Sequence, residues 1–142
     1  MLVDANLLLY AADRASPHHE RSSDWLTGVL AGTRRVGIPW GSLAAFLRIS
    51  TNARATRTPL TAAAAWSVID ALLAYDTVWT PLPTARHGEV FGELLRRHQA
   101  TGNLVPDAEL AALALQHGLT VCSADSDFAR FSEVRWLNPL AA

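Results

Sequence analysis

Three aspartates stand at positions where a parallel sheet would bring them together. Asp4 directly follows the apolar pair Leu2–Val3, and Asp125 follows the apolar run at residues 120–122. Asp107 falls in the first turn of a helix that the apolar spacing predicts to begin near residue 106. Because the carboxyl ends of parallel strands and the helix starts that face them line one edge of a sheet, we expect these carboxylates to converge.

Converging carboxylates repel one another, which raises their pKa values unless a cation neutralises them. A site built from oxygen ligands favours a hard divalent ion, so the pattern predicts Mg²⁺, with Mn²⁺ as the alternative. Each aspartate alone is more often a helix cap than a metal ligand, because Asp accepts backbone N–H bonds at helix N-termini. Asp127, directly before Phe128, is most simply such a cap.

Several other chemistries are excluded by composition. All 12 basic residues are arginine, so the lysine of a Walker-A loop or of a Schiff-base enzyme is missing. The single cysteine, Cys122, excludes an internal disulfide framework and a multi-cysteine zinc site, and its apolar neighbours indicate a core residue. The sequence also contains no His-Glu-x-x-His, Gly-x-Ser-x-Gly or Gly-x-Gly-x-x-Gly motif.

Charge is unevenly distributed along the chain although the net charge is only −1. Residues 25 to 69 contain five arginines and no acid, whereas the rest of the chain carries seven arginines and all 13 acids. This asymmetry is typical of a protein that binds a polyanion with one part and uses carboxylates in another. We expect Arg48, Arg54 and Arg57 to make the main contacts with this polyanion. The alternatives are solvated surface arginines without a ligand and, for Arg48, an internal pair with an acid.

The pattern along the chain alternates short apolar runs with helical periodicity. Strands are predicted at residues 2–3, 36–39, 78–79, 119–122 and 134–137, and helices at 16–30, 40–49, 61–73, 84–98 and 106–117. Residues 7–12 form either a buried strand or a helix turn, and residues 52–59 a polar loop. This alternation predicts an α/β fold in which helices cover both faces of a parallel sheet.

Length and hydropathy predict one domain over residues 1–142. Half of the residues are apolar, which supports a hydrophobic core. No apolar run approaches the ~18 residues of a membrane span, so we expect no membrane association. With one cysteine and no signal-peptide pattern at the N-terminus, a reducing, cytoplasmic location is the simplest expectation.

Three segments resemble the PIN-domain ribonucleases, in particular the VapC toxins of bacterial toxin–antitoxin pairs. LVDANLLLY (2–10) resembles the family's opening, and GNLVPDAELAALA (102–114) is similar to its third acidic motif. VCSADSDF (121–128) looks like its last motif, a strand followed by Thr/Ser-x-Asp-x-Asp-Phe. Each motif is short, but all three occur in the family's order and spacing over nearly the whole chain.

The resemblance implies a PIN-like three-layer α/β/α sandwich that acts as a metal-dependent endoribonuclease and leaves 5′-phosphate and 3′-hydroxyl ends. It further implies a homodimer and a small VapB-type antitoxin that blocks the site, while the arginine-rich segment would hold the RNA backbone. The metal-binding and catalytic acids would be Asp4, Asp107 and Asp125. Supporting polar positions near the metal would be Asn6, Ser123 and Asp127.

One position departs from the family's pattern. The family usually carries a glutamate in the helix after the second strand, but the corresponding stretch here is LAAFLR (43–48), with Ala45 at the glutamate position. This departure leaves open whether one or two metals bind, and it favours the alternative of a weak or silent module that binds RNA or a partner. A small-molecule phosphatase is a third alternative, but its usual Asp-x-Asp is Asp4-Ala5-Asn6 here, and no lysine is present.

Overall fold

Five short parallel strands form the centre of the molecule, which is a computed structural model that describes residues 1–141. Their order across the sheet is β3-β2-β1-β4-β5, and every neighbouring pair is parallel. The strands are β1 (Leu2–Val3), β2 (Val36–Gly37), β3 (Val78–Trp79), β4 (Val121–Cys122) and β5 (Trp136–Leu137). Because β1 and β4 are neighbours, the residues that follow them meet at one edge.

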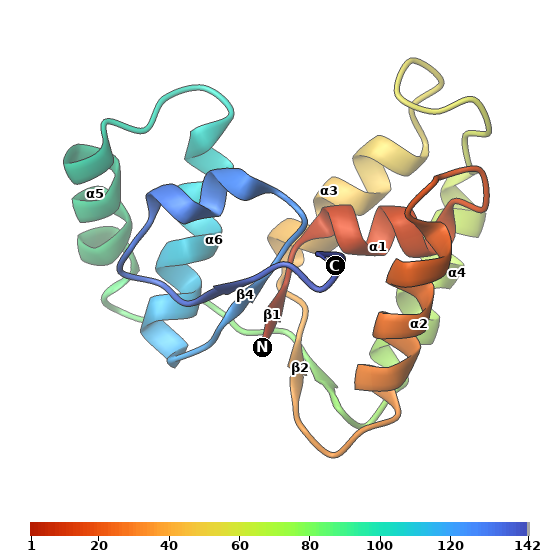
Figure 1. The fold of residues 1–142 in the computed structure, drawn as a ribbon, viewed down its shortest axis with the longest axis horizontal. Helices are drawn as coiled ribbons and strands as arrows, with labels where there is room; N and C mark the ends of the chain where they lie inside the picture. Colours follow the sequence, from red (N-terminus) through yellow and green to blue (C-terminus); the bar gives the residue numbers. More distant parts are fainter. Residues whose placement is uncertain (142) are drawn as a thin grey trace.

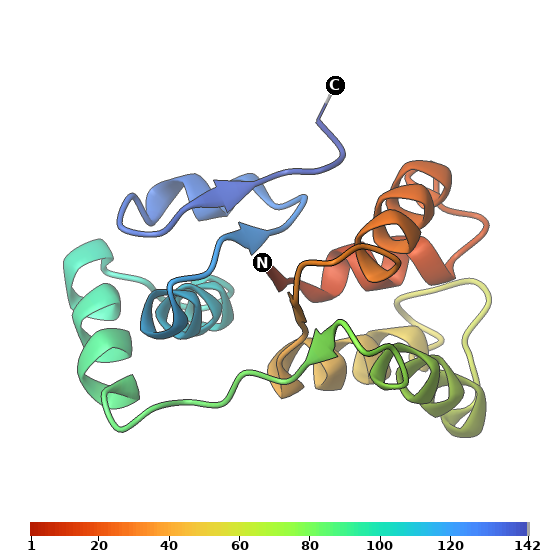
Figure 2. The same cartoon turned by 90° about the horizontal axis from the view of Figure 1, so that it is seen from below.

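Helices connect the strands and divide into two groups on either side of the sheet (Figures 1 and 2). The first group is α1 (Ala5–Ala12), α2 (His19–Leu30), α3 (Trp40–Ser50) and α4 (Ala62–Leu73). The second group is α5 (His87–His98), α6 (Leu104–His117) and the 3₁₀ helix η1 (Ser126–Arg130). Within residues 1–141, no helix combines the length and the apolar composition needed to cross a membrane.

Successive side chains of the central strands point to opposite faces of the sheet and contribute to two separate apolar cores. In β1, Leu2 packs into the core beneath α5, α6 and η1, whereas Val3 packs into the core formed with α1 to α4. In β4, Val121 and Cys122 divide between the same two cores in the same way. Since successive strand side chains point to opposite faces, this division confirms the predicted three-layer sandwich with a parallel sheet.

Some helix boundaries differ from the predicted ones for local reasons. The ambiguous residues 7–12 belong to helix α1, which Asp4 caps. Helix α2 begins at His19 instead of residue 16, because the Ser16 hydroxyl accepts the N–H of His18 in a turn. Helix α5 begins at His87, since Thr84 bonds instead to Gln116 of α6.

Glycine is required in β2, where the chain passes close to its neighbours. A Cβ atom on Gly37 would lie 2.9 Å from the Pro81 side chain and 3.0 Å from the Met1 carbonyl oxygen. The first contact would push away the segment that leads from β3 to α5. The absence of a side chain therefore allows β1, β2 and this crossover to pack closely.

Candidate active site

Four aspartates gather at the carboxyl edge of β1 and β4. Asp4 ends β1 and caps α1 by accepting the N–H of Ala5 at 2.7 Å. Asp125 follows β4 and caps η1 by accepting the N–H of Asp127 at 2.9 Å. Asp107 lies in the first turn of α6. The strand ends and helix starts thus carry acids to one edge, as the sequence pattern predicts.

The tightest group of acids differs from the predicted trio. Asp107, Asp125 and Asp127 each offer a carboxylate oxygen, and these oxygens lie within 4.8 Å of one another. The interpretation of Asp127 as a helix cap is wrong, because the cap of η1 is Asp125 and Asp127 lies in the first turn of η1. Asp4 is outside this tightest group, although its charge helps to raise the pKa of Asp107, and the charge of Asp125 helps to raise the pKa of Asp4.

Asp4 is held by hydrogen bonds to both of its carboxylate oxygens. Oδ1 accepts the N–H of Ala5, and Oδ2 accepts the Ser123 hydroxyl at 2.7 Å and the Asn6 amide at 3.3 Å. The Asn6 amide also donates to Ser123 Oγ at 2.9 Å, and Ser123 Oγ accepts the N–H of Asp125 at 3.0 Å. Asn6 and Ser123 therefore fix the orientation of Asp4 and connect it to the segment that carries Asp125.

The acids share an unfavourable electrostatic environment. Burial, followed by the charges of Asp125, Asp4 and Asp127, raises the pKa of Asp107 from its usual 3.8 to about 7. Burial also raises the pKa of Asp4, although hydrogen bonds from Ser123 and Ala5 oppose the shift. Both shifts arise because carboxylates are partly withdrawn from water beside other carboxylates.

No arginine or histidine among the described residues pairs with the four aspartates. Along residues 1–141, every ion pair closer than 4.0 Å involves a glutamate, and none involves the four aspartates. Three converging, half-buried carboxylates that lack a basic partner in the described part of the chain provide the oxygen ligands that a hard divalent cation needs. The residues present therefore fit a divalent metal.

Helix α3 contacts the end of β1 through Ser42, which belongs to none of the sequence motifs. The buried Ser42 hydroxyl donates to the Val3 carbonyl oxygen at 2.8 Å, directly before Asp4. Its signal in the sequence was only a serine in the first turn of an otherwise apolar helix, which is too common to identify. Ala45, one turn further along α3, is half-buried and outside both apolar cores. Glu109 faces away, 3.8 Å from His87 of α5.

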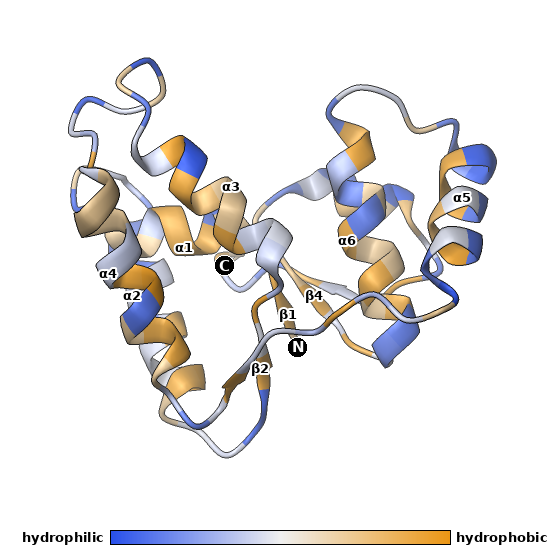
Figure 3. Cartoon of the chain, turned by 180° about the vertical axis from the view of Figure 1, so that it is seen from behind, coloured by the Kyte–Doolittle hydropathy of each residue, from blue (hydrophilic) through white to orange (hydrophobic). Residues whose placement is uncertain are grey.

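The predicted RNA-binding arginines are exposed on the other side of the molecule from α5. Arg48 lies in the last turn of α3, and Arg54 and Arg57 lie in the hydrophilic loop that follows it (Figure 3). In the part of the chain that the structure describes, none of the three has a carboxylate within 4.0 Å, so the internal pair considered for Arg48 does not form. Arg57 also borders a hollow of about 820 Å³ beside α1 and α3, which the four aspartates do not line.

Known proteins match this chain over nearly its whole length. A family model described as the PIN domain matches residues 1–134. Ribonuclease VapC37 of Mycobacterium tuberculosis is 43% identical over 99% of this chain and 97% of its own length. Ribonuclease VapC43 of the same organism is 37% identical over 99% of this chain and 95% of its own length. These matches confirm the resemblance found in the motifs.

Solved structures of low identity show the same fold. VapC20 of Mycobacterium tuberculosis, described as a sarcin–ricin loop cleaving toxin, has a TM-score of 0.70 at 20% identity and covers 94% of this chain and 98% of its own. A chain of the VapBC2 complex of Rickettsia felis, bound to a fragment of promoter DNA, has a TM-score of 0.68 at 18% identity. It covers 96% of each chain.

Proposed function

The chain belongs to the PIN-domain family, and from this membership we propose that it is a metal-dependent endoribonuclease, the toxin of a VapC-type toxin–antitoxin pair. The observation that carries the proposal is the cluster of Asp107, Asp125 and Asp127 beside Asp4, which has no arginine or histidine partner among residues 1–141. Relatives named as ribonucleases, at 34–43% identity over nearly the whole chain, support the choice of RNA as substrate.

We assign the metal to the carboxylates of Asp4, Asp107 and Asp125, with Asp127 as a further ligand or a support close to it. The ion is Mg²⁺, for which Mn²⁺ can substitute, because all of the available ligand atoms are oxygens. A divalent cation held there supplies a Lewis acid that lowers the pKa of water and offsets charge on the phosphate oxygens. Asn6 and Ser123 hold Asp4 in place through the hydrogen bonds described above.

The proposed reaction is hydrolysis of a phosphodiester. Oxygen from water adds to phosphorus, the bond from phosphorus to the 3′ oxygen breaks, and that oxygen takes up a proton. The products carry 5′-phosphate and 3′-hydroxyl ends. The chain contributes carboxylates of fixed orientation at the reacting phosphate, while Arg48, Arg54 and Arg57 hold other phosphates of the same RNA.

The decisive test is cleavage of total cellular RNA by the purified protein, followed by sequencing of the new 5′ ends. We expect new 5′-phosphate ends with Mg²⁺ and none with a chelator. Asp125→Asn is the matched variant, because its amide oxygen can still cap η1 while the ligand charge is lost. Identical ends produced in the presence of chelator or by Asp125→Asn would contradict the metal assignment.

A silent binding module is the second candidate, and Ala45 is the observation that favours it. With alanine in place of the family's usual glutamate, the cluster lacks the carboxylate that α3 would provide. Such a module would bind RNA without metal-dependent turnover. Binding of RNA together with a complete absence of cleavage at high Mg²⁺ or Mn²⁺ would establish this candidate over the enzyme.

The same family membership supports proposals about partners and location. We propose a homodimer that a small VapB-type antitoxin inhibits in the cytoplasm, where the RNA substrate is found. Light scattering of the purified chain would give its mass in solution. Addition of the cognate antitoxin should form a complex of larger mass and stop cleavage. A monomer, or full cleavage by the complex, would contradict these proposals.

A further inference from the structure

Ser123 connects three strands at the acidic edge. Its side chain is fully buried and contacts Asp4, Asn6 and the N–H of Asp125. Its main chain is held by β5, because the Ser123 N–H donates to the Leu137 carbonyl oxygen at 3.0 Å. The position of the hydroxyl that orients Asp4 therefore depends on how firmly β5 holds the Ser123 main chain.

The parallel ladder between β4 and β5 lacks its next donor at this point. Cys122 pairs with Leu137, so the next backbone N–H that would reach the Ser123 carbonyl oxygen belongs to residue 139. Residue 139 is proline, which has no N–H. The Trp136 indole Nε1–H occupies the vacant place and donates to the Ser123 carbonyl oxygen at 3.0 Å. A side chain thus replaces the missing backbone donor.

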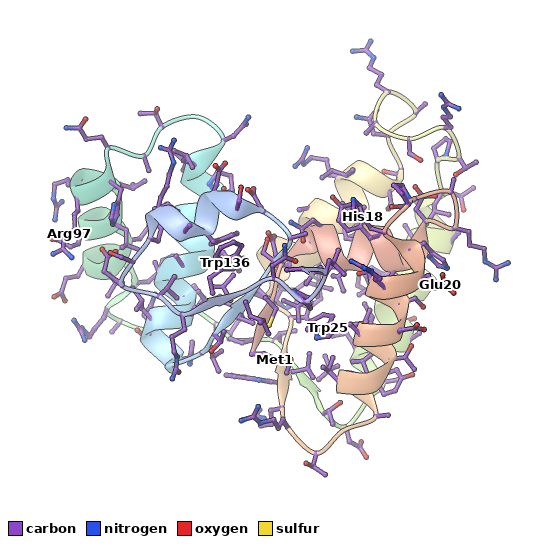
Figure 4. All side chains as sticks on the ribbon, in the orientation of Figure 1. Met1, His18, Glu20, Trp25, Arg97 and Trp136 are labelled. Atoms are coloured by element: carbon purple, nitrogen blue, oxygen red, sulfur yellow. The ribbon has the colours of Figure 1, made fainter. Side chains whose placement is uncertain are left out.

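We propose that Trp136 is a positioning residue for the metal centre, acting through Ser123 on Asp4 and on the segment that carries Asp125. This inference rests on the proposed function. Trp136 lies centrally in the molecule, far from the peripheral Arg97 (Figure 4), and its ring packs against the core beneath α6. Its indole N–H and the Leu137 carbonyl hold both polar groups of the Ser123 main chain.

The chain offers a matched control in Trp79 of β3. Its indole Nε1 is buried and has no hydrogen-bond partner among the residues that the structure describes. Trp79→Phe therefore removes the same N–H group without breaking a hydrogen bond. Trp136→Phe keeps the aromatic ring but leaves the Ser123 carbonyl oxygen without a donor, which is the more costly change.

The experiment measures Mn²⁺ binding to the metal-free full chain, without RNA, from the electron paramagnetic resonance signal of free Mn²⁺. Replacement of groups that orient metal ligands typically weakens metal affinity about 10- to 100-fold. We expect Ser123→Ala to fall in that range, and Trp136→Phe, one contact further away, to weaken binding about 3- to 10-fold. Trp79→Phe should bind Mn²⁺ as the wild type does.

A double variant tests whether Trp136 acts through Ser123. If it does, Trp136→Phe combined with Ser123→Ala loses little more affinity than Ser123→Ala alone, because coupled residues are not additive. Thermal melts of all variants identify those that are folded at the temperature of the titration. Unchanged Mn²⁺ affinity in a folded Trp136→Phe, or a loss that multiplies with that of Ser123→Ala, overturns the proposal.

Metal binding is measured apart from catalysis, so failure of the ribonuclease proposal can be distinguished from failure of the proposed role of Trp136. A wild type that binds Mn²⁺ but cuts no RNA contradicts the ribonuclease activity and leaves the role of Trp136 intact. A wild type that binds no Mn²⁺ overturns the metal assignment, and the role of Trp136 with it.

Discussion

The arginines of α5 occur in an environment opposite to that of the arginines in α3 and the loop after it. Arg97 of α5 lies 2.8 Å from Glu93 and 3.2 Å from Glu133, which itself lies 2.8 Å from His98. Arg48, by contrast, has no carboxylate within 4.0 Å in the described chain, and the same holds for the arginines of the loop after α3. Exposed ion pairs contribute little to stability, so the difference lies in which charges remain available to a ligand.

The acids divide in the same way as the arginines. The glutamates of α5 are paired with arginines, whereas the aspartates at the carboxyl edge of β1 and β4 are paired with none in residues 1–141. Unpaired negative charge therefore lies at the sheet edge, and unpaired positive charge lies along α3 and the loop after it. This separation is what a nuclease needs, since a metal and the phosphates of its substrate require opposite charges in different places.

The largest effect is expected from Asp107→Asn, which removes one unpaired negative charge. RNA cleavage should fall at least about 100-fold, because a direct metal ligand is more important than the groups around it. The metal-free variant should melt no earlier than the wild type at neutral pH, since repulsion from the neighbouring aspartates is relieved. Glu93→Gln, in the paired set, is the control and should cleave normally. Near-native cleavage by Asp107→Asn at limiting Mg²⁺ would refute the assignment.

The unpaired arginines can be compared directly with paired ones through the salt dependence of RNA binding. On single strands each neutralised phosphate contributes about −0.7 to the slope of log affinity against log salt. Changing Arg54 and Arg57 together to glutamine should flatten that slope by roughly one unit or more if both contact phosphates. The control changes Arg86, which directly precedes α5, and Arg96 of α5; this pair should leave the slope unchanged. Equal effects of the two pairs would show that ion pairing does not identify the RNA-binding arginines.

Ala45→Glu adds a carboxylate from α3 to the unpaired acids. We expect the Mg²⁺ concentration for half-maximal cleavage to fall several-fold, because ligand charge tunes the affinity for divalent ions. The cost to the fold should be modest, since alanine and glutamate both favour helices and Ala45 is only half-buried. Ala44→Glu, at the adjacent exposed position, is the control. Early melting without a gain in cleavage at any Mg²⁺ level would place Ala45 in packed structure instead.

The smallest effect concerns pH. Because the pKa of Asp107 rises from 3.8 to about 7 on folding, the folded chain holds a proton between those values that the unfolded chain releases. Below about pH 4 both states hold the proton, so stability from this group is lost as pH rises toward about 7. Melting temperatures of the metal-free protein should therefore fall by a few degrees across this window.

In Asp107→Asn the melting temperature should depend less on pH. The raised pKa of Asp4 should account for part of the pH dependence that remains. A melting temperature that falls from pH 4 to 7 as much in Asp107→Asn as in the wild type would contradict this assignment of the shift. The paired Glu133, whose pKa is lowered, serves as the opposing case: its contribution is lost as pH falls.

The sequence by itself determined the kinds of elements and the edge at which the acids gather. Apolar runs of strand length alternate with helical periodicity, Asp4 follows β1 directly, and Asp125 comes shortly after β4. Local patterns were therefore sufficient to place Asp4, Asp107 and Asp125 at one edge of the sheet. The predicted helix limits at residues 61 and 117 agree with the cap at Thr61 and with Gly118, whose φ of +63° ends α6, because both residue types favour these positions. Such features depend on neighbours within one helical turn.

Only the tertiary structure decided which acids form the tightest cluster and which side chains hold them. Asp127 faces its partners because η1 is a 3₁₀ helix with Asp125 as its cap, which residue type alone does not distinguish from a cap at Asp127. The bond from Ser123 to Asp4 spans 119 positions of sequence, and the Trp136 bond to Ser123 depends on the register of β5 against β4. Register and packing between distant segments leave no local periodicity, and they decide which side chains meet.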